Sequence, residues 1–158
     1  VEYKGPVYIR INRNDMPDVF PEDEDFVIGK LYKLREGKDV VIFVTGIMVS
    51  KALNAAEKLE KEGISVRVVN VSTLKPLDED AVKELAKGMK GVVTAEEHSY
   101  IGGLASAITY ALRGSALPVE VVAINDQFGQ SSHDYEELLE HYGLTEENII
   151  NKVKSLIK

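Results

Sequence analysis

The sequence predicts an α/β fold, a three-layer α/β/α sandwich whose five-stranded sheet is mostly parallel with one antiparallel edge strand. Two observations carry this prediction. Short apolar runs alternate along the chain with amphipathic segments of ten or more residues, the order that produces right-handed crossovers onto a parallel sheet. In addition, the apolar run at 40–44 contains only Val, Ile and Phe, as expected of a strand that is covered on both faces.

The first 25 residues differ in composition from the rest of the chain. Val7–Ile11 (VYIRI) alternates as one short strand would, and residues 12–25 after it hold two prolines and six acidic residues, a composition typical of a linker. A lone strand followed by a linker cannot bury itself. We therefore expect residues 1–25 to be the last strand and linker of a preceding domain, and residues 26–158 to form the α/β domain.

The strands of that domain are expected in a definite order. Turns at Gly29 and Gly37 bracket a segment near 31–34, which a short turn joins to the run at 40–44, so this segment is the candidate antiparallel edge strand. Three further strands are predicted at 65–71, 91–95 and 118–124.

The helices are predicted from spacing and from capping residues. Val49, Ala52 and Ala56 recur at helical spacing, and Gly63 is placed to end that helix. Asp78 is the predicted N-cap of the second helix, and Thr145 that of the last. The two remaining helices are expected within 101–114 and 133–143.

Composition excludes several kinds of function. The formal net charge of −7 argues against a surface for nucleic acid or anionic membrane, because both require clustered Lys and Arg. The chain contains no cysteine, so disulfides, thiolate catalysis and Cys-type zinc sites are ruled out, and no other metal site is expected. No apolar run approaches the roughly 20 residues that a membrane span needs, and a cytoplasmic location fits these features.

The turn between the strand at 40–44 and the first helix does not predict a nucleotide site. It contains Gly46 but not the three spaced glycines of a dinucleotide-binding turn, although any helix N-terminus can bind a phosphate. The next strand ends near Asn70 rather than at an acidic residue that would hold a ribose.

The segment TAEEHSYIGG, residues 94–103, has two interpretations. Glu96 and Glu97 are adjacent, so in an extended backbone they point to opposite sides and cannot act as a close carboxylate pair. His98 beside one of them would make a proton shuttle. Alternatively, Gly102 and Gly103 let a helix approach closely while the polar residues cap the turn or line an interface. The spacing favours the second interpretation.

Four phrases in order resemble the C-terminal part of transketolase, and together they cover essentially the whole chain. They are GPVYIRINRNDMP, then REGKDVVIFVTGIMVSKALNAAEKLEKEGISVRVVNVSTLKPLD, then VVTAEEHSYIGGLASAI, and last NDQFGQSSHDYEELLEHYGLT. Deoxyxylulose-phosphate synthases and the β subunits of 2-oxoacid dehydrogenases share this domain. The EEH, FG and YGLT groups favour transketolase over both, and the resemblance fits either a split subunit or an excised fragment.

The resemblance implies a division of labour. In transketolase the N-terminal domain holds the diphosphate of thiamine diphosphate with its Mg²⁺, and the middle domain supplies the aminopyrimidine site and the activating glutamate. This chain resembles only the last strand of that pyrimidine-binding domain and the whole third domain. The implied cofactor therefore lies mainly outside the chain, no catalytic residue is expected here, and the isolated chain should be inactive.

The same resemblance implies partners. They are an N-terminal transketolase section and the sugar phosphates of the pentose phosphate pathway, with the assembly forming a homodimer. On this interpretation Glu96, Glu97, His98, Gly102 and Gly103 shape an interdomain or dimer contact. A non-catalytic regulatory or binding module with the same fold stays open as the alternative.

One functional residue carries over by position. Transketolases have a motif of the form S-R-Q-x-L-P after the last middle-domain strand, and its arginine binds the phosphate of the sugar substrate. The matching text here is INRNDMP, which gives that role to Arg13, with Asn12, Asn14 and Met16 departing from the pattern. A guanidinium group suits phosphate oxygens. Pairing of Arg13 with an aspartate of its own loop is the structural alternative, and Arg10 is a weaker second candidate.

Overall fold

The five predicted strands form one sheet in the computed structural model, which describes residues 3–12 and 15–157. The strands are β1 (Tyr32–Arg35), β2 (Val40–Val44), β3 (Val66–Asn70), β4 (Gly91–Ser99) and β5 (Val119–Ile124), in the order β1-β3-β2-β4-β5. β1 runs antiparallel to β3, and the other neighbouring pairs are parallel. The predicted sheet with one antiparallel edge strand is confirmed.

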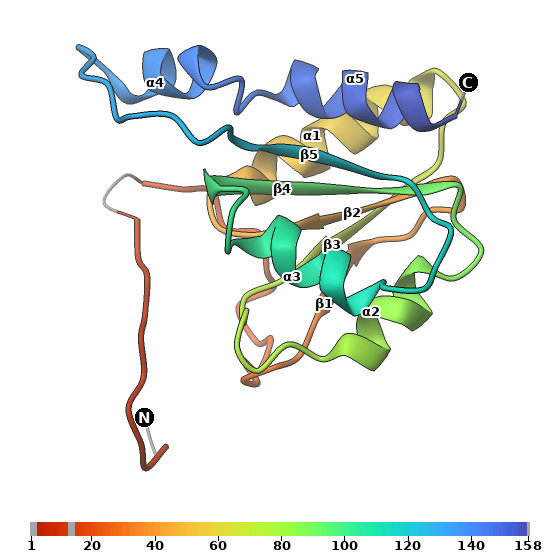
Figure 1. Cartoon of the computed structure of the whole chain (residues 1–158), viewed down its shortest axis with the longest axis horizontal. Helices are drawn as coiled ribbons and strands as arrows, with labels where there is room; N and C mark the ends of the chain where they lie inside the picture. The colour runs from red at the N-terminus through yellow and green to blue at the C-terminus, as the bar shows by residue number, and fades with distance from the viewer. Residues whose placement is uncertain (1–2, 13–14, 158) are drawn as a thin grey trace.

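Helices cover both faces of this sheet (Figure 1). They are α1 (Met48–Lys61), α2 (Glu79–Ala86), α3 (Leu104–Ala111), α4 (Tyr135–His141) and α5 (Glu146–Leu156). Residues of α2 and α3 pack into the core on one face, and residues of α1, α4 and α5 pack into the core on the other. The three-layer α/β/α sandwich is therefore confirmed.

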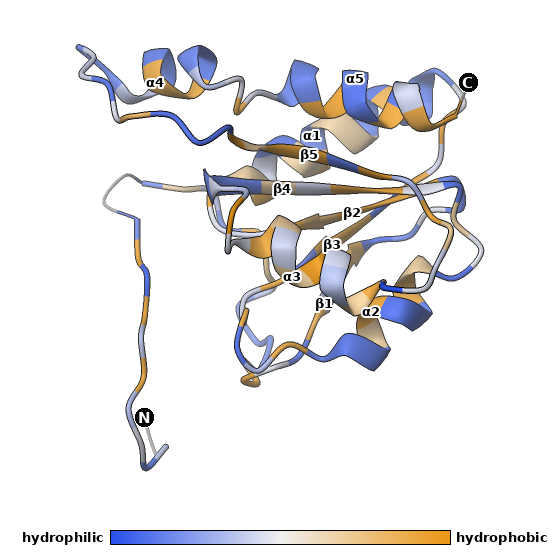
Figure 2. Cartoon of the chain, viewed as in Figure 1, coloured by the Kyte–Doolittle hydropathy of each residue, from blue (hydrophilic) through white to orange (hydrophobic). Residues whose placement is uncertain are grey.

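The central strand β2 shows why the core has two halves. Its alternate side chains point to opposite faces, so Val40, Ile42 and Val44 belong to the core under α1 and α5. Val41 and Phe43 belong to the core under α2 and α3. All five are fully buried, and β2 has the colour of hydrophobic residues in Figure 2. A strand of this kind has no polar face, which is why its sequence is a continuous apolar run.

Helices α2 and α5 begin at the capping residues that the sequence predicts. The Asp78 carboxylate accepts a hydrogen bond from the Ala81 amide at 2.9 Å, and the Thr145 hydroxyl accepts one from the Asn148 amide at 3.2 Å. Both caps satisfy a backbone N–H that the helix itself cannot pair, and each is worth about 1 kcal/mol.

The turn between β1 and β2 lies tightly against the start of β3. A Cβ atom at Gly37 would come within 2.1 Å of the backbone at Val66 and Arg67, so only glycine fits there. Next to it, the Asp39 carboxylate accepts the Ser65 amide at 2.8 Å and pairs with Lys90. The Lys90 hydrogen bond, then that of the Ser65 amide, lower the pKa of Asp39.

The described N-terminal residues 3–12 extend away from the sheet as a single extended segment (Figure 1). Val7–Ile11 carries the predicted alternation, but none of the described strands pairs with it, so it forms no sheet here. Tyr8 and Ile11 are 89% and 84% exposed. The proposed boundary at residue 25 stays a prediction. Within the described residues no helix combines the length and the apolarity that crossing a membrane requires.

Candidate functional site at the carboxyl end of β4

The TAEEHS segment lies at the carboxyl end of β4, the edge where parallel α/β sheets bind ligands. β4 continues through Ser99, beyond the strand predicted at 91–95. Its pairing with β5 shifts register between Ala95 and Ser99. Glu96, Glu97 and His98 are thus held in extended backbone, where consecutive side chains alternate in direction.

Glu96 points toward α3 and caps that helix from outside it. Its carboxylate accepts hydrogen bonds from the Leu104 amide at 2.7 Å and the Ala105 amide at 2.8 Å. Gly103, the N-cap residue of α3, supplies no side-chain cap, so the carboxylate takes over that task. Glu96 is 1% exposed, and the partial positive charge of the helix N-terminus compensates its negative charge. In this position Glu96 serves the fold.

The glycine pair makes this cap possible. A Cβ atom at Gly103 would lie 2.2 Å from Oε2 of Glu96 and 2.7 Å from the carbonyl oxygen of Ser99. Gly102 has φ +77, a conformation that favours glycine, and its amide donates to the Ser106 hydroxyl. The geometry agrees with the interpretation in which the glycines permit close approach and the polar residues cap the turn.

Glu97 points to the opposite face of the sheet, as expected for a neighbour of Glu96. Its Oε1 accepts a hydrogen bond from the Tyr135 hydroxyl at 2.7 Å. Its Oε2 forms an ion pair with the Arg10 guanidinium at 3.2 Å. One carboxylate therefore links the first residue of α4 to the extended N-terminal segment.

Tyr135 completes this link. Its hydroxyl also receives a hydrogen bond from the Asn12 side-chain amide at 3.3 Å. Burial, and then the hydrogen bond to Glu97, raise the pKa of Tyr135 to about 12, because both favour the neutral phenol. We call Arg10, Asn12, Glu97 and Tyr135 the Glu97 cluster.

His98 does not pair with either carboxylate in the described contacts. Its Nδ1 lies 2.8 Å from the carbonyl oxygen of Ser99, to which the ring N–H donates, and the side chain is exposed. The Glu–His proton shuttle that the sequence left open is thus not assembled. Arg13, the predicted phosphate ligand, lies outside the described residues.

Sequence reasoning missed Tyr135 in this cluster, and it named Arg10 only as a second candidate for the substrate phosphate. Nothing in the sequence singles out Tyr135, and the alternation around Arg10 indicates only one face of a strand. Arg10 lies 87 residues from Glu97, and Tyr135 lies 38 residues from it. No local periodicity reports contacts over such separations, so no signal in the sequence marks them.

The described residues do not fit the metal ion of the implied cofactor. No group of three or more His, Asp or Glu side chains in the described part of the chain could hold a metal ion.

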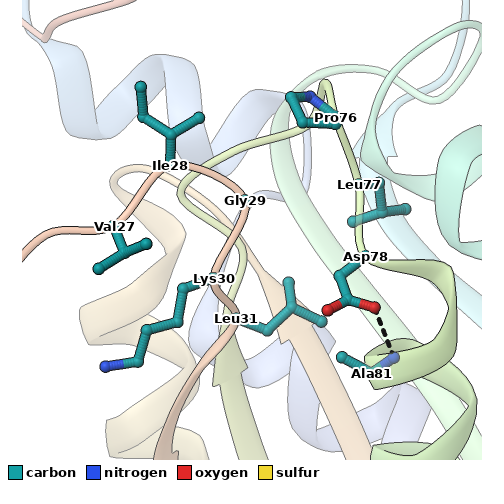
Figure 3. Close-up of a pocket in the computed structure, with 9 residues that line it drawn as sticks. All are labelled: Val27, Ile28, Gly29, Lys30, Leu31, Pro76, Leu77, Asp78 and Ala81. Atoms are coloured by element: carbon teal, nitrogen blue, oxygen red, sulfur yellow. Dashed lines mark hydrogen bonds between the residues drawn. The ribbon is translucent and has the colours of Figure 1, made fainter. Parts of the chain in front are cut away.

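A hollow beside the N-terminus of α2 offers no polar recognition either (Figure 3). Most of the residues that line it are apolar, among them Val27, Ile28 and Leu77. Its Asp78 is engaged in capping α2, and its Lys30 pairs with Glu24 at 2.8 Å. A small-molecule site needs convergent polar groups, and here the charged groups already have partners.

Comparison with known proteins finds a matching family model and similar proteins. The family model described as "Transketolase, C-terminal domain" matches residues 29–149. The chain is 45% identical over 150 residues to the 6-deoxy-6-sulfo-D-fructose transketolase subunit SqwH of Clostridium sp. (strain MSTE9), covering 94% of this chain and 46% of that protein. It is 35% identical over 159 residues to a subunit of the apulose-4-phosphate transketolase of Phocaeicola vulgatus, covering 100% of this chain and 51% of that protein.

A solved structure agrees with these relatives. It is described as a split gene transketolase, inactive beta4 tetramer, and it superposes with a TM-score of 0.84 at 45% identity. The similarity covers 92% of this chain and 47% of that one. The chain thus spans about half the length of each of these three proteins.

Proposed function

Because this chain belongs to the transketolase C-terminal domain family, we propose that it is the C-terminal part of a transketolase, a transferase that moves a two-carbon ketol unit between sugar phosphates. The observation that carries the proposal is the family match over residues 29–149. Relatives named as transketolase subunits support it. In this proposal the chain is one section of an assembly, and the assembly is the enzyme.

The partner in this proposal is an N-terminal section that carries the diphosphate- and pyrimidine-binding domains. The exposed apolar side chains of Tyr8, Ile9 and Ile11 support it. An extended segment with unpaired backbone groups can add as a strand to the edge of another sheet. Burial of each large apolar side chain there would contribute about 1.5–3 kcal/mol. The predicted last strand of the pyrimidine-binding domain, within residues 1–25, would then join the sheet of that domain in the partner.

Thiamine diphosphate and Mg²⁺ belong to the assembled enzyme in this proposal and bind mainly outside this chain. Inactivity of the isolated chain follows from that arrangement. The solved structure of a similar protein is described as an inactive beta4 tetramer, and this description supports the expected inactivity of the isolated chain. Homodimer formation by the assembly and a cytoplasmic location are parts of the same proposal.

Arg13 is proposed to bind the phosphate of the sugar substrate. The support is its place in INRNDMP, the text that matches the family motif. A guanidinium donates two parallel hydrogen bonds to phosphate oxygens and keeps its charge at any physiological pH. In the assembled enzyme, Arg13→Ala should raise the KM for the sugar phosphate by about thirtyfold or more, because loss of a buried charged contact costs about 2–5 kcal/mol. An unchanged KM would remove Arg13 from the substrate site.

The test is a coupled ketol-transfer assay with thiamine diphosphate and Mg²⁺. The chain is assayed alone and then with a polypeptide that supplies the first two transketolase domains, and size-exclusion chromatography checks that the two bind. Transfer in the mixture alone supports the proposal. Transfer by the chain alone contradicts the placement of the cofactor outside it.

Two further results would point to the alternatives. Binding without turnover indicates a non-catalytic module with the same fold. Formation of 1-deoxy-D-xylulose 5-phosphate in the same mixture indicates the related synthase.

A further inference from the structure

We propose that Glu97 is a positioning residue: its carboxylate, at the carboxyl end of β4, anchors the N-terminal segment 3–12, which Arg13 follows in the sequence. The inference rests on the proposed function, because the substrate role of Arg13 belongs to that proposal. It gives Glu97 and Arg10 a role that differs from the interdomain contact and the phosphate contact suggested by the family resemblance, and it adds Asn12 and Tyr135.

The contacts of Glu97 are divided between two parts of the chain. Oε1 accepts from Tyr135 on α4 at 2.7 Å, and Oε2 pairs with Arg10 of the N-terminal segment at 3.2 Å. Asn12 of the same segment donates to the Tyr135 hydroxyl. The segment is therefore attached at two positions to one carboxylate–phenol pair.

The two sides of the extended N-terminal segment have different surroundings. Arg10 and Asn12 are two residues apart, so their side chains lie on one side of extended backbone. Ile9 and Ile11 lie on the other side and are 68% and 84% exposed. One side thus holds the segment to this domain, while the other stays available for the sheet of a partner.

Glu97 is itself held firmly enough to act as an anchor. Its neighbour Glu96 is fixed on the opposite face by two α3 amides, which sets the direction of Glu97. Tyr135 is the first residue of α4, directly after the capping residue Asp134. The anchor therefore stands on a strand and a helix start rather than on a loop.

Chain connectivity carries this restraint to Arg13. Arg13 follows Asn12 directly in the sequence, so a contact that holds Asn12 restrains the chain at the residue before Arg13. The ion pair with Glu97 also assigns Arg10 to anchoring, which distinguishes it from Arg13 as a phosphate ligand. A substrate-binding group held in place before binding loses less entropy when it engages its ligand.

The first test measures the anchor in the chain without its partner. Since the chain has no cysteine, Ile9→Cys and Lys87→Cys give two clean sites for nitroxide labels, and pulsed electron paramagnetic resonance gives the distribution of distances between them. Glu97→Gln should broaden that distribution about twofold or more, because an amide cannot form the ion pair with Arg10. An unchanged width would overturn the proposal.

The matched control is Glu79→Gln. Arg113 and Glu79 form an ion pair at 2.7 Å, with the Arg113 side chain 53% exposed, the same fraction as that of Arg10. This pair contacts neither the segment nor β4 in the described hydrogen bonds. Glu79→Gln should leave the distance distribution unchanged, and broadening there would show a general effect of charge and count against a specific anchor.

The second test uses the assembled enzyme. Glu97→Gln should raise the KM for the sugar phosphate about threefold to fivefold, the range expected for one partly exposed ion pair, with kcat unchanged. Combined with Arg13→Ala, it should add nothing further, because positioning acts through Arg13. A merely structural defect would lower kcat or add to the Arg13→Ala effect, and either result would overturn positioning.

The two tests separate the two proposals. If Glu97→Gln broadens the distance distribution but leaves the KM unchanged, Glu97 does not position Arg13, and the transketolase proposal stays intact. If the two chains bind but show no ketol transfer, the transketolase proposal and the substrate role of Arg13 are both contradicted. The width of the distance distribution between the labels still tests whether Glu97 anchors the segment.

Discussion

Replacement of Glu96 by glutamine tests whether this carboxylate serves the fold. Both of its oxygens accept backbone N–H groups of α3, at 2.7 and 2.8 Å, in a site that is 1% exposed. Glutamine keeps the shape but turns one oxygen into an NH₂ group, which would face a backbone donor. Glu96→Gln therefore removes one hydrogen bond and leaves two donors opposed.

The expected loss follows from two contributions. A hydrogen bond to a charged acceptor contributes about 1.5–3 kcal/mol, and the favourable interaction of a negative charge with a helix N-terminus contributes about 0.3–1 kcal/mol. The sum, about 2–4 kcal/mol, is a large part of the roughly 5–15 kcal/mol that stabilises a typical domain. At about 2–4 °C per kcal/mol for a chain of this size, Tm should fall by roughly 10 °C.

The assay is thermal unfolding of the isolated chain, followed by circular dichroism, with Glu97→Gln as the control. Glu97 has the same side chain one residue away, but its ion pair reaches a half-exposed Arg10, and such pairs contribute about 1 kcal/mol at most. The Tm of Glu97→Gln should fall by no more than about 4 °C. If Glu96→Gln lowers Tm no more than the control does, the capping argument is wrong.

Three more predictions come from the described contacts. Gly103→Ala should lower Tm by about as much as Glu96→Gln, since its methyl group would lie 2.2 Å from the capping carboxylate oxygen; an unchanged Tm would contradict the close approach. Asp39→Asn should cost about 1 kcal/mol in urea unfolding at pH 7. Because the pKa of Asp39 is lowered in the folded state, its carboxylate stabilises the fold above pH 3.8, and this stabilisation is lost as the pH falls through the folded-state pKa. The free energy of unfolding of Asp39→Asn should therefore fall less on acidification than that of the wild type. Tyr135 should titrate near pH 12 in ultraviolet absorbance, above the ordinary 10.0, and this late component should be missing from Tyr135→Phe. Its stabilising effect is fully present below pH 10.0 and is lost as pH rises through about 12; a late component that persists in the variant would assign it to another tyrosine.

Local sequence determined the layers of this protein. Strand β2 is a continuous apolar run because both of its faces are covered, and that run can be read without any knowledge of the fold. Asp78 and Thr145 cap their helices by accepting a hydrogen bond from the amide three residues later in the chain, and a sequence pattern can reveal so short a separation. The opposite directions of Glu96 and Glu97 also follow from extended backbone alone.

Only the tertiary structure decided what the carboxyl end of β4 does. The sequence presented Glu96, Glu97 and His98 as one group, yet folding sends Glu96 to the α3 amides, Glu97 to Tyr135 and Arg10, and leaves His98 exposed. Backbone geometry fixes the side on which each side chain lies, but the partner on that side comes from a distant segment. Packing of the core, to which Leu139 of α4 belongs, sets the approach of α4. The N-terminal segment is held by its contacts with Glu97 and Tyr135, and no local pattern encodes either arrangement.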